Sequence, residues 1–225
     1  MEIIRIEGIR HAYEKKEILK GITLSIDNSD LIAITGENGS GKTTLLNIIA
    51  LLIKPNSGQI YYGDKLLDLS KNKERDEYRR ERIGIVSQDF SLIYDLNVFD
   101  NIALSLQAQR LSAKVIKQRV NQTITELGLE NLSKKYPGAL SGGECQKVAI
   151  ARALVKGPEL ILADELTASL DTENKTEIIK LLLKLSKKDI AIVIVTHDKE
   201  VLSFMSKVYL IQEGKLIALN GKEQV

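Results

Sequence analysis

A glycine-rich segment followed by lysine and threonine is the part of the sequence best suited to bind phosphate. Residues 36–43 read Gly-Glu-Asn-Gly-Ser-Gly-Lys-Thr and match the pattern G-x-x-x-x-G-K-[ST]. The glycines let backbone N–H groups turn toward phosphate oxygens, and a helix that begins here adds partial positive charge. Lys42 would reach the β- and γ-phosphates of a nucleotide, and the Thr43 hydroxyl would ligate Mg²⁺. The alternative is an accidental glycine-rich turn. The candidate nucleotide-binding residues of this segment are Gly36, Asn38, Gly39, Ser40, Gly41, Lys42, Thr43 and Thr44.

Two adjacent carboxylates follow an apolar run later in the chain. Residues 159–165 read Glu-Leu-Ile-Leu-Ala-Asp-Glu, and the carboxyl end of a strand in a parallel sheet faces the ligand crevice. Asp164 would hold Mg²⁺, directly or through water, and Glu165 would accept a proton from the water that attacks the γ-phosphate. Acidic residues are also favoured at helix N-termini. The carboxylate pair therefore indicates catalysis only together with the phosphate-binding segment.

A serine and two glycines open an apolar helical pattern in residues 140–154. The segment begins Leu-Ser-Gly-Gly-Glu-Cys-Gln, which is typical of a second anion-binding helix start. The alternative is a helix-capping serine followed by flexible glycines. Two phosphate-binding elements roughly a hundred residues apart are unusual for an ordinary nucleotide hydrolase.

The elements that must position these residues alternate between strands and helices. Four short runs are apolar almost throughout, as strands buried on both faces of a parallel sheet are. These runs are residues 31–35, 83–86, 160–163 and 190–195. Helical patterns cover residues 42–53, 113–127 and 172–185. The alternation predicts an α/β fold with a mainly parallel sheet.

Two further segments predict a small antiparallel edge region. Residues 22–26 alternate between apolar and polar, and residues 208–212 and 215–219 flank a tight turn at Glu213 and Gly214. Residues 90–157 contain helical patterns and predict a helical lobe inserted between two strands. We expect a single domain with a catalytic core of about residues 1–89 and 158–225 and a lobe of about residues 90–157. The densely charged residues 71–82 carry both signs and favour a solvated helix face over a nucleic-acid patch.

Residues 36–43, 140–146 and 160–165 together with His197 resemble the nucleotide-binding subunit of an ABC transporter, over essentially the whole chain. The Leu-Ser-Gly-Gly segment is the specific part, because it separates this family from other P-loop proteins. The resemblance implies a P-loop NTPase fold with a RecA-like sheet, and ATP hydrolysis with Mg²⁺ that is coupled to transport. It also implies an active site split between two copies. Ser141, Gly142 and Gly143 of one copy would bind the γ-phosphate that the other copy holds.

The resemblance assigns roles to four single residues as well. Tyr13 would stack on adenine, Gln88 would touch Mg²⁺ and face the membrane partner, Asp171 would cross the dimer interface, and His197 would contact the γ-phosphate. Each has an ordinary alternative: Tyr13 in packing, Gln88 on the surface, Asp171 as a helix cap and His197 as a structural hydrogen-bonding group. Order and spacing favour the functional roles. The candidate catalytic residues are therefore Lys42, Gln88, Glu165 and His197, and the candidate metal ligands are Thr43, Gln88 and Asp164.

Two positions depart from the common family pattern. Glu144 stands where glutamine is usual, a change that family variants share. Leu166 stands where proline is usual; because proline would stiffen that turn, we expect a looser loop with the same catalytic atoms. Cys145, the only cysteine, excludes an internal disulfide and fits a reducing compartment.

Composition limits the partners. An apolar fraction of 44% and a charged fraction of 28% exclude a disordered or low-complexity chain, and a net charge of +2 shows no general bias toward nucleic acid. The start lacks a signal-peptide pattern, and no apolar stretch is long enough for a membrane span. We therefore expect a cytoplasmic protein held on the inner face of the cell membrane by a separate transmembrane permease. The second nucleotide-binding subunit is expected to be another copy of this chain, joined in the presence of ATP.

The segments 89–104 and 140–154 are most similar to ATPases of the lipoprotein-release, macrolide-efflux and peptide-antibiotic export group. That similarity implies an exporter or mechanotransmission system, contacted through the lobe near residues 90–101. The alternatives are an importer ATPase for amino acids or metals, and a cell-division ATPase that signals without transport. A non-transport ATPase acting on ribosomes or DNA is disfavoured, because the chain has one phosphate loop and no heptad run. A nucleotide-binding regulator without catalysis is contradicted by Glu165.

Overall fold

The strands form two sheets in the computed structural model, which describes residues 1–168 and 170–219. The first sheet is antiparallel and contains, in spatial order, β2 (Lys16–Asp27), β1 (Glu2–Tyr13), β4 (Ser57–Tyr62) and β5 (Lys65–Leu66). The second contains β10 (Lys215–Leu219), β9 (Lys207–Gln212), β3 (Leu31–Thr35), β8 (Ala191–Val195), β7 (Leu160–Asp164) and β6 (Ile83–Val86). All neighbouring pairs from β9 to β6 are parallel. The α/β fold with a mainly parallel sheet is confirmed.

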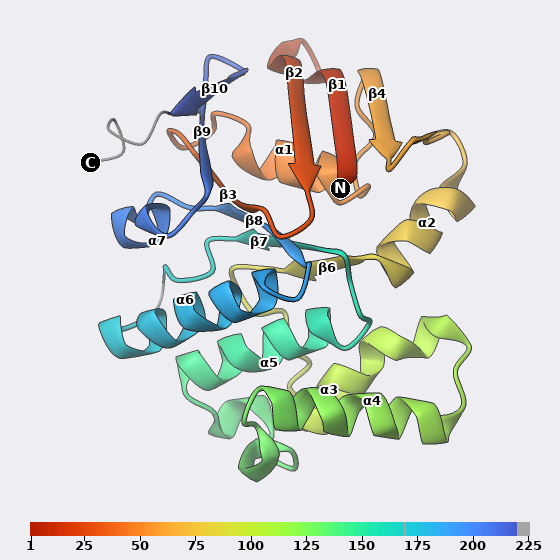
Figure 1. Cartoon of the computed structure of the whole chain (residues 1–225), viewed down its shortest axis with the longest axis vertical. Helices are drawn as coiled ribbons and strands as arrows, with labels where there is room; N and C mark the ends of the chain where they lie inside the picture. The colour runs from red at the N-terminus through yellow and green to blue at the C-terminus, as the bar shows by residue number, and fades with distance from the viewer. Residues whose placement is uncertain (169, 220–225) are drawn as a thin grey trace.

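Helices cover both faces of the parallel sheet. The α-helices are α1 (Lys42–Ile49), α2 (Asn72–Glu81), α3 (Val98–Ala103), α4 (Ala113–Glu126), α5 (Gly142–Leu154), α6 (Thr172–Ser186) and α7 (Lys199–Ser203). Short 3₁₀ helices are η1 (Leu104–Gln109), η2 (Glu130–Leu132) and η3 (Pro137–Ala139). Figure 1 shows α1 between the two sheets and α5 and α6 on the opposite side of the parallel sheet. The helices α3 and α4 lie beyond α5.

Successive residues of the parallel strands point into two different cores. Ile32 and Ile34 pack with α1 and the antiparallel sheet, whereas Ala33 packs with α5 and α6. A strand covered on both faces must be apolar at every position, which explains the four apolar runs of the sequence. The runs at residues 31–35 and 83–86 match β3 and β6. Strand β7 continues one residue beyond the third run, to Asp164, and β8 begins one residue after the start of the fourth, at Ala191.

Residues 90–157 contain helices and no strand, as predicted, and they are inserted between the neighbouring strands β6 and β7. Their own core is formed by residues of α3, α4 and one face of α5: Val98, Ile102, Val120, Ile124, Val148, Ala151 and Val155. The other face of α5 packs on the sheet through Ala149 and Ile150. Because α5 is buried on both sides, it links the helical segment to the sheet.

Helix α1 ends at Ile49, four residues before the predicted end at Ile53. Leu51 adopts a left-handed backbone with a φ of 58°. The Leu52 N–H donates to the Asn47 carbonyl at 2.9 Å, and the Leu51 N–H donates to the Ile48 carbonyl at 3.0 Å. This pattern is the usual helix stop with a left-handed residue. A glycine at position 51 would have predicted the end of the helix from the sequence, but this position holds leucine.

The predicted antiparallel edge region is divided between the two sheets. Residues 22–26 belong to β2, which pairs with β1. The hairpin at residues 207–219 extends the parallel sheet instead, since β9 pairs parallel with β3 and only β10 is antiparallel. Alternation along a strand indicates that one face is exposed. It does not indicate which sheet the strand joins.

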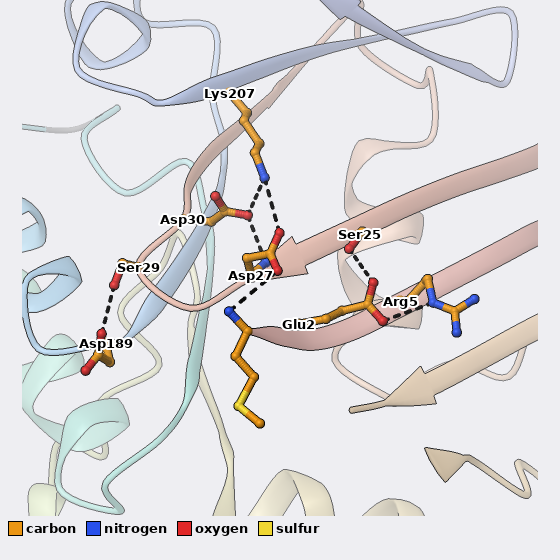
Figure 2. Close-up of polar contacts among 9 residues, drawn as sticks. Glu2, Arg5, Ser25, Asp27, Ser29, Asp30, Asp189 and Lys207 are labelled. Atoms are coloured by element: carbon orange, nitrogen blue, oxygen red, sulfur yellow. Dashed lines mark hydrogen bonds and ion pairs between the residues drawn. The ribbon is translucent and has the colours of Figure 1, made fainter. Parts of the chain in front are cut away.

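Polar contacts fix the turn between β2 and β3 (Figure 2). The Lys207 ammonium group, at the start of β9, donates to Asp30 at 2.7 Å and lies 3.7 Å from Asp27 at the end of β2. The Asp27 N–H donates to the Asp30 carboxylate at 2.8 Å. Ser29 donates to Asp189, just before β8, at 3.2 Å. These contacts join the two sheets where β3 begins, and β3 leads directly into the glycine-rich segment.

Candidate functional site

Four adjacent parallel strands, β3, β8, β7 and β6, end at the same edge of the sheet. Val195 pairs with Ile34 on one side and with Asp164 on the other, so these ends are level. The candidate residues at this edge are Gly36 after β3, His197 after β8, Asp164 and Glu165 at the end of β7, and Gln88 after β6. The sheet therefore collects segments that are far apart in sequence.

The glycine-rich segment is folded so that its first and last glycines cannot be replaced without strain. A Cβ on Gly36 would lie 2.5 Å from the Ile211 carbonyl oxygen, and one on Gly41 would lie 2.8 Å from Leu19. Gly36 and Gly41 also have φ values of 144° and 107°, which favour glycine. The Lys42 ammonium group donates to the carbonyls of Gly36 and Glu37 at 2.8 and 2.9 Å. The Lys42 side chain is therefore held against the first two residues of the loop.

Thr43 and Asp164 meet although 121 residues separate them. The Thr43 hydroxyl donates to Oδ2 of Asp164 at 2.9 Å. A hydroxyl and a carboxylate at hydrogen-bond distance are oxygen donors of the type Mg²⁺ prefers, and this ion commonly uses one or two carboxylates with water and phosphate oxygens. The pair therefore fits a magnesium ion beside a bound phosphate.

Glu165 is held in an uncommon backbone conformation. Its φ is 49°, in the left-handed region, and its N–H donates to the Val195 carbonyl at 2.9 Å. The carboxylate Oε1 lies 2.9 Å from Nδ1 of His197. Leu166 is 2% exposed and packs in the core with α5 and α6. The buried Leu166 side chain therefore holds the turn after Glu165 against the core, at the position where the family pattern has proline.

Tyr13 lies beside the glycine-rich segment. A pocket of about 260 Å³ is lined by Tyr13, Ile18, Gly39, Gly41, Lys42, Thr43 and Thr44. The Tyr13 ring is 50% exposed and meets the buried His11 ring edge-on, with 4.8 Å between the ring centroids. An exposed ring held from one side can accept a flat, apolar group on its other surface.

Ser141 and Asp171 lie at the starts of α5 and α6. Both cap their helices: the Ser141 hydroxyl accepts from the Glu144 N–H at 3.2 Å, and the Asp171 carboxylate accepts from the Asn174 N–H at 2.9 Å. Within residues 1–168 and 170–219, no hydrogen bond or ion pair joins either residue to the glycine-rich segment. Neither residue is among those that line the pocket beside the glycine-rich segment.

Sequence reasoning missed two contacts that shape the site. Glu144 completes a capping box, because its carboxylate accepts from the Ser141 N–H at 2.7 Å. The pattern serine-x-x-glutamate is a known signal for this arrangement and could have revealed it. Arg152 on α5 donates to the carbonyls of Phe90, at 2.7 Å, and Ser91. It ties the segment after Gln88 to α5, and no local sequence signal predicts this contact.

A parallel sheet with a glycine-rich phosphate loop, a lysine and a carboxylate pair at its carboxyl edge defines a nucleotide-hydrolysing P-loop protein. Comparison with known proteins specifies the family. Residues 19–168 match the family model described as ABC transporter, and the chain belongs to this family.

Relatives within the family work in different transport systems. The lipoprotein-releasing system ATP-binding protein LolD of Aquifex aeolicus is 37% identical over 216 residues, which cover 96% of this chain and 96% of LolD. The methionine import ATP-binding protein MetN of Helicobacter pylori is 36% identical over 227 residues, which cover 99% of this chain and 69% of MetN. A dimeric structure of the ATP-binding cassette MJ0796 bound to ADP and Pi superposes with a TM-score of 0.86 and 32% identity. It covers 97% of this chain and 100% of that cassette.

The chain is therefore an ATP-binding subunit that hydrolyses ATP, and the hydrolysis is coupled to transport. In residues 1–168 and 170–219, no helix combines the length and the apolar character needed to cross a membrane.

Proposed function

We propose that this subunit dimerises around two ATP molecules with Mg²⁺ and drives a separate membrane protein of an export or mechanotransmission system for a peptide, lipoprotein or antibiotic. The observation that carries the dimer is that Ser141 caps α5 and does not line the pocket beside the phosphate-binding residues of the same copy. A γ-phosphate held by Lys42 of one copy and by the Ser141 turn of another would join the two copies, and hydrolysis would release them.

The residues of the site would divide the chemistry among them. Lys42 would exchange its two carbonyl partners for β- and γ-phosphate oxygens, and Tyr13 would stack on adenine. Glu165 would take the proton of the attacking water, and His197 would orient Glu165 and contact the γ-phosphate. Thr43, Asp164 and Gln88 would hold Mg²⁺, which supplies neutralisation of phosphate charge.

The Ser141 hydroxyl suits the role of a partner ligand. Its oxygen accepts the Glu144 N–H, and its own hydrogen remains available for donation, because a hydroxyl has one donor and two acceptor positions. Gly142 and Gly143 follow directly, so backbone N–H groups at the start of α5 can face the same anion. Asp171 starts the neighbouring α6 and would meet the partner at the same face.

Trapping the dimer tests this proposal. Glu165→Gln keeps the shape of the side chain but removes the base, so we expect a dimer in gel filtration with Mg-ATP and a monomer without nucleotide. Lys42→Ala in the same background should abolish ATP binding and the dimer, because the phosphates lose their main cation. A protein that stays monomeric at saturating Mg-ATP, with ATP binding measured directly, would contradict the dimer.

The partner surface is proposed to be the segment near residues 90–101. Asn101, which is fully buried, donates to the carbonyls of Ile93 and Leu96 at 3.0 and 2.8 Å. This holds a loop on which Ile93 is 41% and Tyr94 is 71% exposed. Apolar side chains on a firmly held loop are suited to bind another protein. Binding there would place the subunit on the inner, cytoplasmic face of the cell membrane.

An importer is the second candidate, because MetN covers 99% of this chain at 36% identity. A pull-down from solubilised membranes, followed by identification of the bound permease, separates the two. We expect an export or mechanotransmission permease, and Tyr94→Asp should release it while ATP binding is unchanged. A permease that works with an external substrate-binding protein would favour import instead.

A further inference from the structure

The starts of α5 and α6 meet at Gly143 and Asn174. A Cβ on Gly143 would lie 2.0 Å from Oδ1 of Asn174 and 2.5 Å from its Cγ. Gly143 is buried, so no side chain larger than hydrogen fits there while Asn174 keeps its place. Gly143 is thus required by the neighbouring helix as well as by any phosphate that binds to it.

The side-chain amide of Asn174 also forms a hydrogen bond with Asp171. Its Nδ2 donates to Oδ2 of Asp171 at 2.7 Å, while the Asn174 backbone N–H donates to Oδ1 at 2.9 Å. These bonds stabilise the charged carboxylate and lower the pKa of Asp171. Asn174 therefore contacts the Ser141–Gly143 turn with one end of its amide and holds Asp171 with the other.

A second contact lies one turn further along both helices. Lys147 forms an ion pair with Glu177. Lys147 follows Gly143 by four residues and Glu177 follows Asn174 by three, so the helices run side by side in the same direction, as Figure 1 shows. Beyond this pair, Ile150 and Ile178 share one core. The two helix starts are thus joined at successive turns.

We propose that Asn174 is a positioning residue that locks Asp171 to the Ser141–Gly143 turn, so that both reach the partner copy as one surface. This rests on the proposed ATP-dependent dimer. In this role Asn174 would act through the two helix caps and not by direct contact with the nucleotide. Its amide contacts both Gly143 and Asp171, whereas the Lys147–Glu177 ion pair joins the two helices one turn further along.

The test uses the full chain in the Glu165→Gln background and compares Asn174→Leu, which branches at the same atom but cannot hydrogen-bond, with Lys180→Ala on an exposed position of α6. The measured quantities are the affinity of the monomer for a fluorescent ATP analogue and the Mg-ATP concentration that gives half-maximal dimer. We expect Asn174→Leu to change the affinity for the ATP analogue by less than twofold and to raise the Mg-ATP concentration for half-maximal dimer at least tenfold. Lys180→Ala should change neither.

The outcomes separate the two claims. If the Glu165→Gln parent and the Asn174→Leu variant dimerise at the same Mg-ATP concentration, the positioning role alone is overturned. This holds even if Asn174→Leu lowers the melting temperature, because a merely structural cap affects stability only. No dimer in the parent would overturn the proposed function and the positioning role with it.

A double variant tests the contact itself. Gly143→Ala should lower the melting temperature, and Asn174→Ala should restore much of it, because only Cβ of residue 174 would then remain near the new methyl group, at 3.1 Å. The dimer should still require more ATP in this double variant than in the parent. Recovery of both stability and dimerisation would overturn the proposal. If Gly143→Ala does not fold, the Asn174→Leu comparison decides.

Discussion

Nδ1 of His197 lies 2.9 Å from Oε1 of Glu165, and the two residues come from neighbouring strands of the parallel sheet. Glu165 follows β7 directly, and Thr196 separates His197 from β8. The His197 side chain is 75% exposed, whereas that of Glu165 is only 15% exposed. The bond therefore directs the Glu165 carboxylate from its solvent side, and within residues 1–168 and 170–219 the imidazole makes no other hydrogen bond or ion pair.

Removing the imidazole should impair catalysis without affecting stability. We expect His197→Ala to lower the rate of ATP hydrolysis at saturating ATP by about 100-fold, the usual scale for an oriented acid–base group. The affinity for ATP and the melting temperature should stay unchanged, because the side chain is exposed. Steady-state hydrolysis, nucleotide titration and thermal unfolding check the three quantities. A fall in melting temperature of the same protein would show that the histidine is structural, the ordinary alternative for this residue.

The Thr43 hydroxyl should be needed for the metal rather than for the fold. Thr43→Val has nearly the same shape but cannot bond to Asp164 or ligate an ion. We expect it to raise the Mg²⁺ concentration for half-maximal hydrolysis at least tenfold, while Thr43→Ser, which keeps the hydroxyl, stays close to the parent. Hydrolysis measured over a Mg²⁺ titration gives the comparison. Identical Mg²⁺ dependence in Thr43→Val would remove Thr43 from the metal site.

The sheet edge could be predicted from the sequence because each part carries its own local signal. The strands before Gly36, Asp164 and His197 are continuous apolar runs, and strands buried on both faces have no other pattern. Once they are parallel neighbours, their carboxyl ends must meet. The contacts of Thr43 with Asp164 and of Glu165 with His197 follow from that geometry, although their distances do not.

Other features depend on contacts between distant segments and have no such signal. Helix α1 ends at Ile49, and the left-handed residue that closes it is a leucine, Leu51, which carries no sequence signal for a helix end. Strand β1 was not predicted, since its irregular register with β2 breaks the alternation of residues 2–13. The amide of Asn174 is likewise an ordinary helix residue in sequence. Its role appears only when α5 lies beside α6.

Glycines that look equivalent in sequence should differ in how far they tolerate a methyl group. A Cβ on Gly84 of β6 would lie 3.1 Å from both Cβ and the carbonyl oxygen of Ala153 on α5 and 3.3 Å from Ile161, whereas one on Gly138 meets nothing within 4 Å. We expect Gly84→Ala to lower the free energy of unfolding by about 1–3 kcal/mol, as overpacking does. Gly138→Ala should be neutral within about 0.5 kcal/mol. Denaturant unfolding measures both, and equal stability of the two variants would contradict the close packing of α5 on β6.

Lys156, which follows α5, should make stability depend on pH above neutrality. Its ammonium group donates to the carbonyls of Arg79 and Ile83 at 2.8 and 2.5 Å, and burial lowers its pKa from 10.5 to about 8. Between these two values the unfolded chain binds more protons than the folded one, so the folded state gains stability as the pH rises from about 8 toward 10.5, and shows no dependence from this group below that range. Lys156→Met should abolish this rise.

Lysine and tyrosine side chains in general have ordinary pKa values near this range, so the comparison must be between variants. Lys180→Met, on an exposed position of α6, loses the same charge without touching the buried site. Unfolding midpoints in urea at several pH values should show the parent and Lys180→Met gaining stability relative to Lys156→Met as the pH rises. Parallel curves for all three proteins would mean that Lys156 titrates like a solvated lysine, and that its position against the carbonyls of Arg79 and Ile83 is not kept in solution.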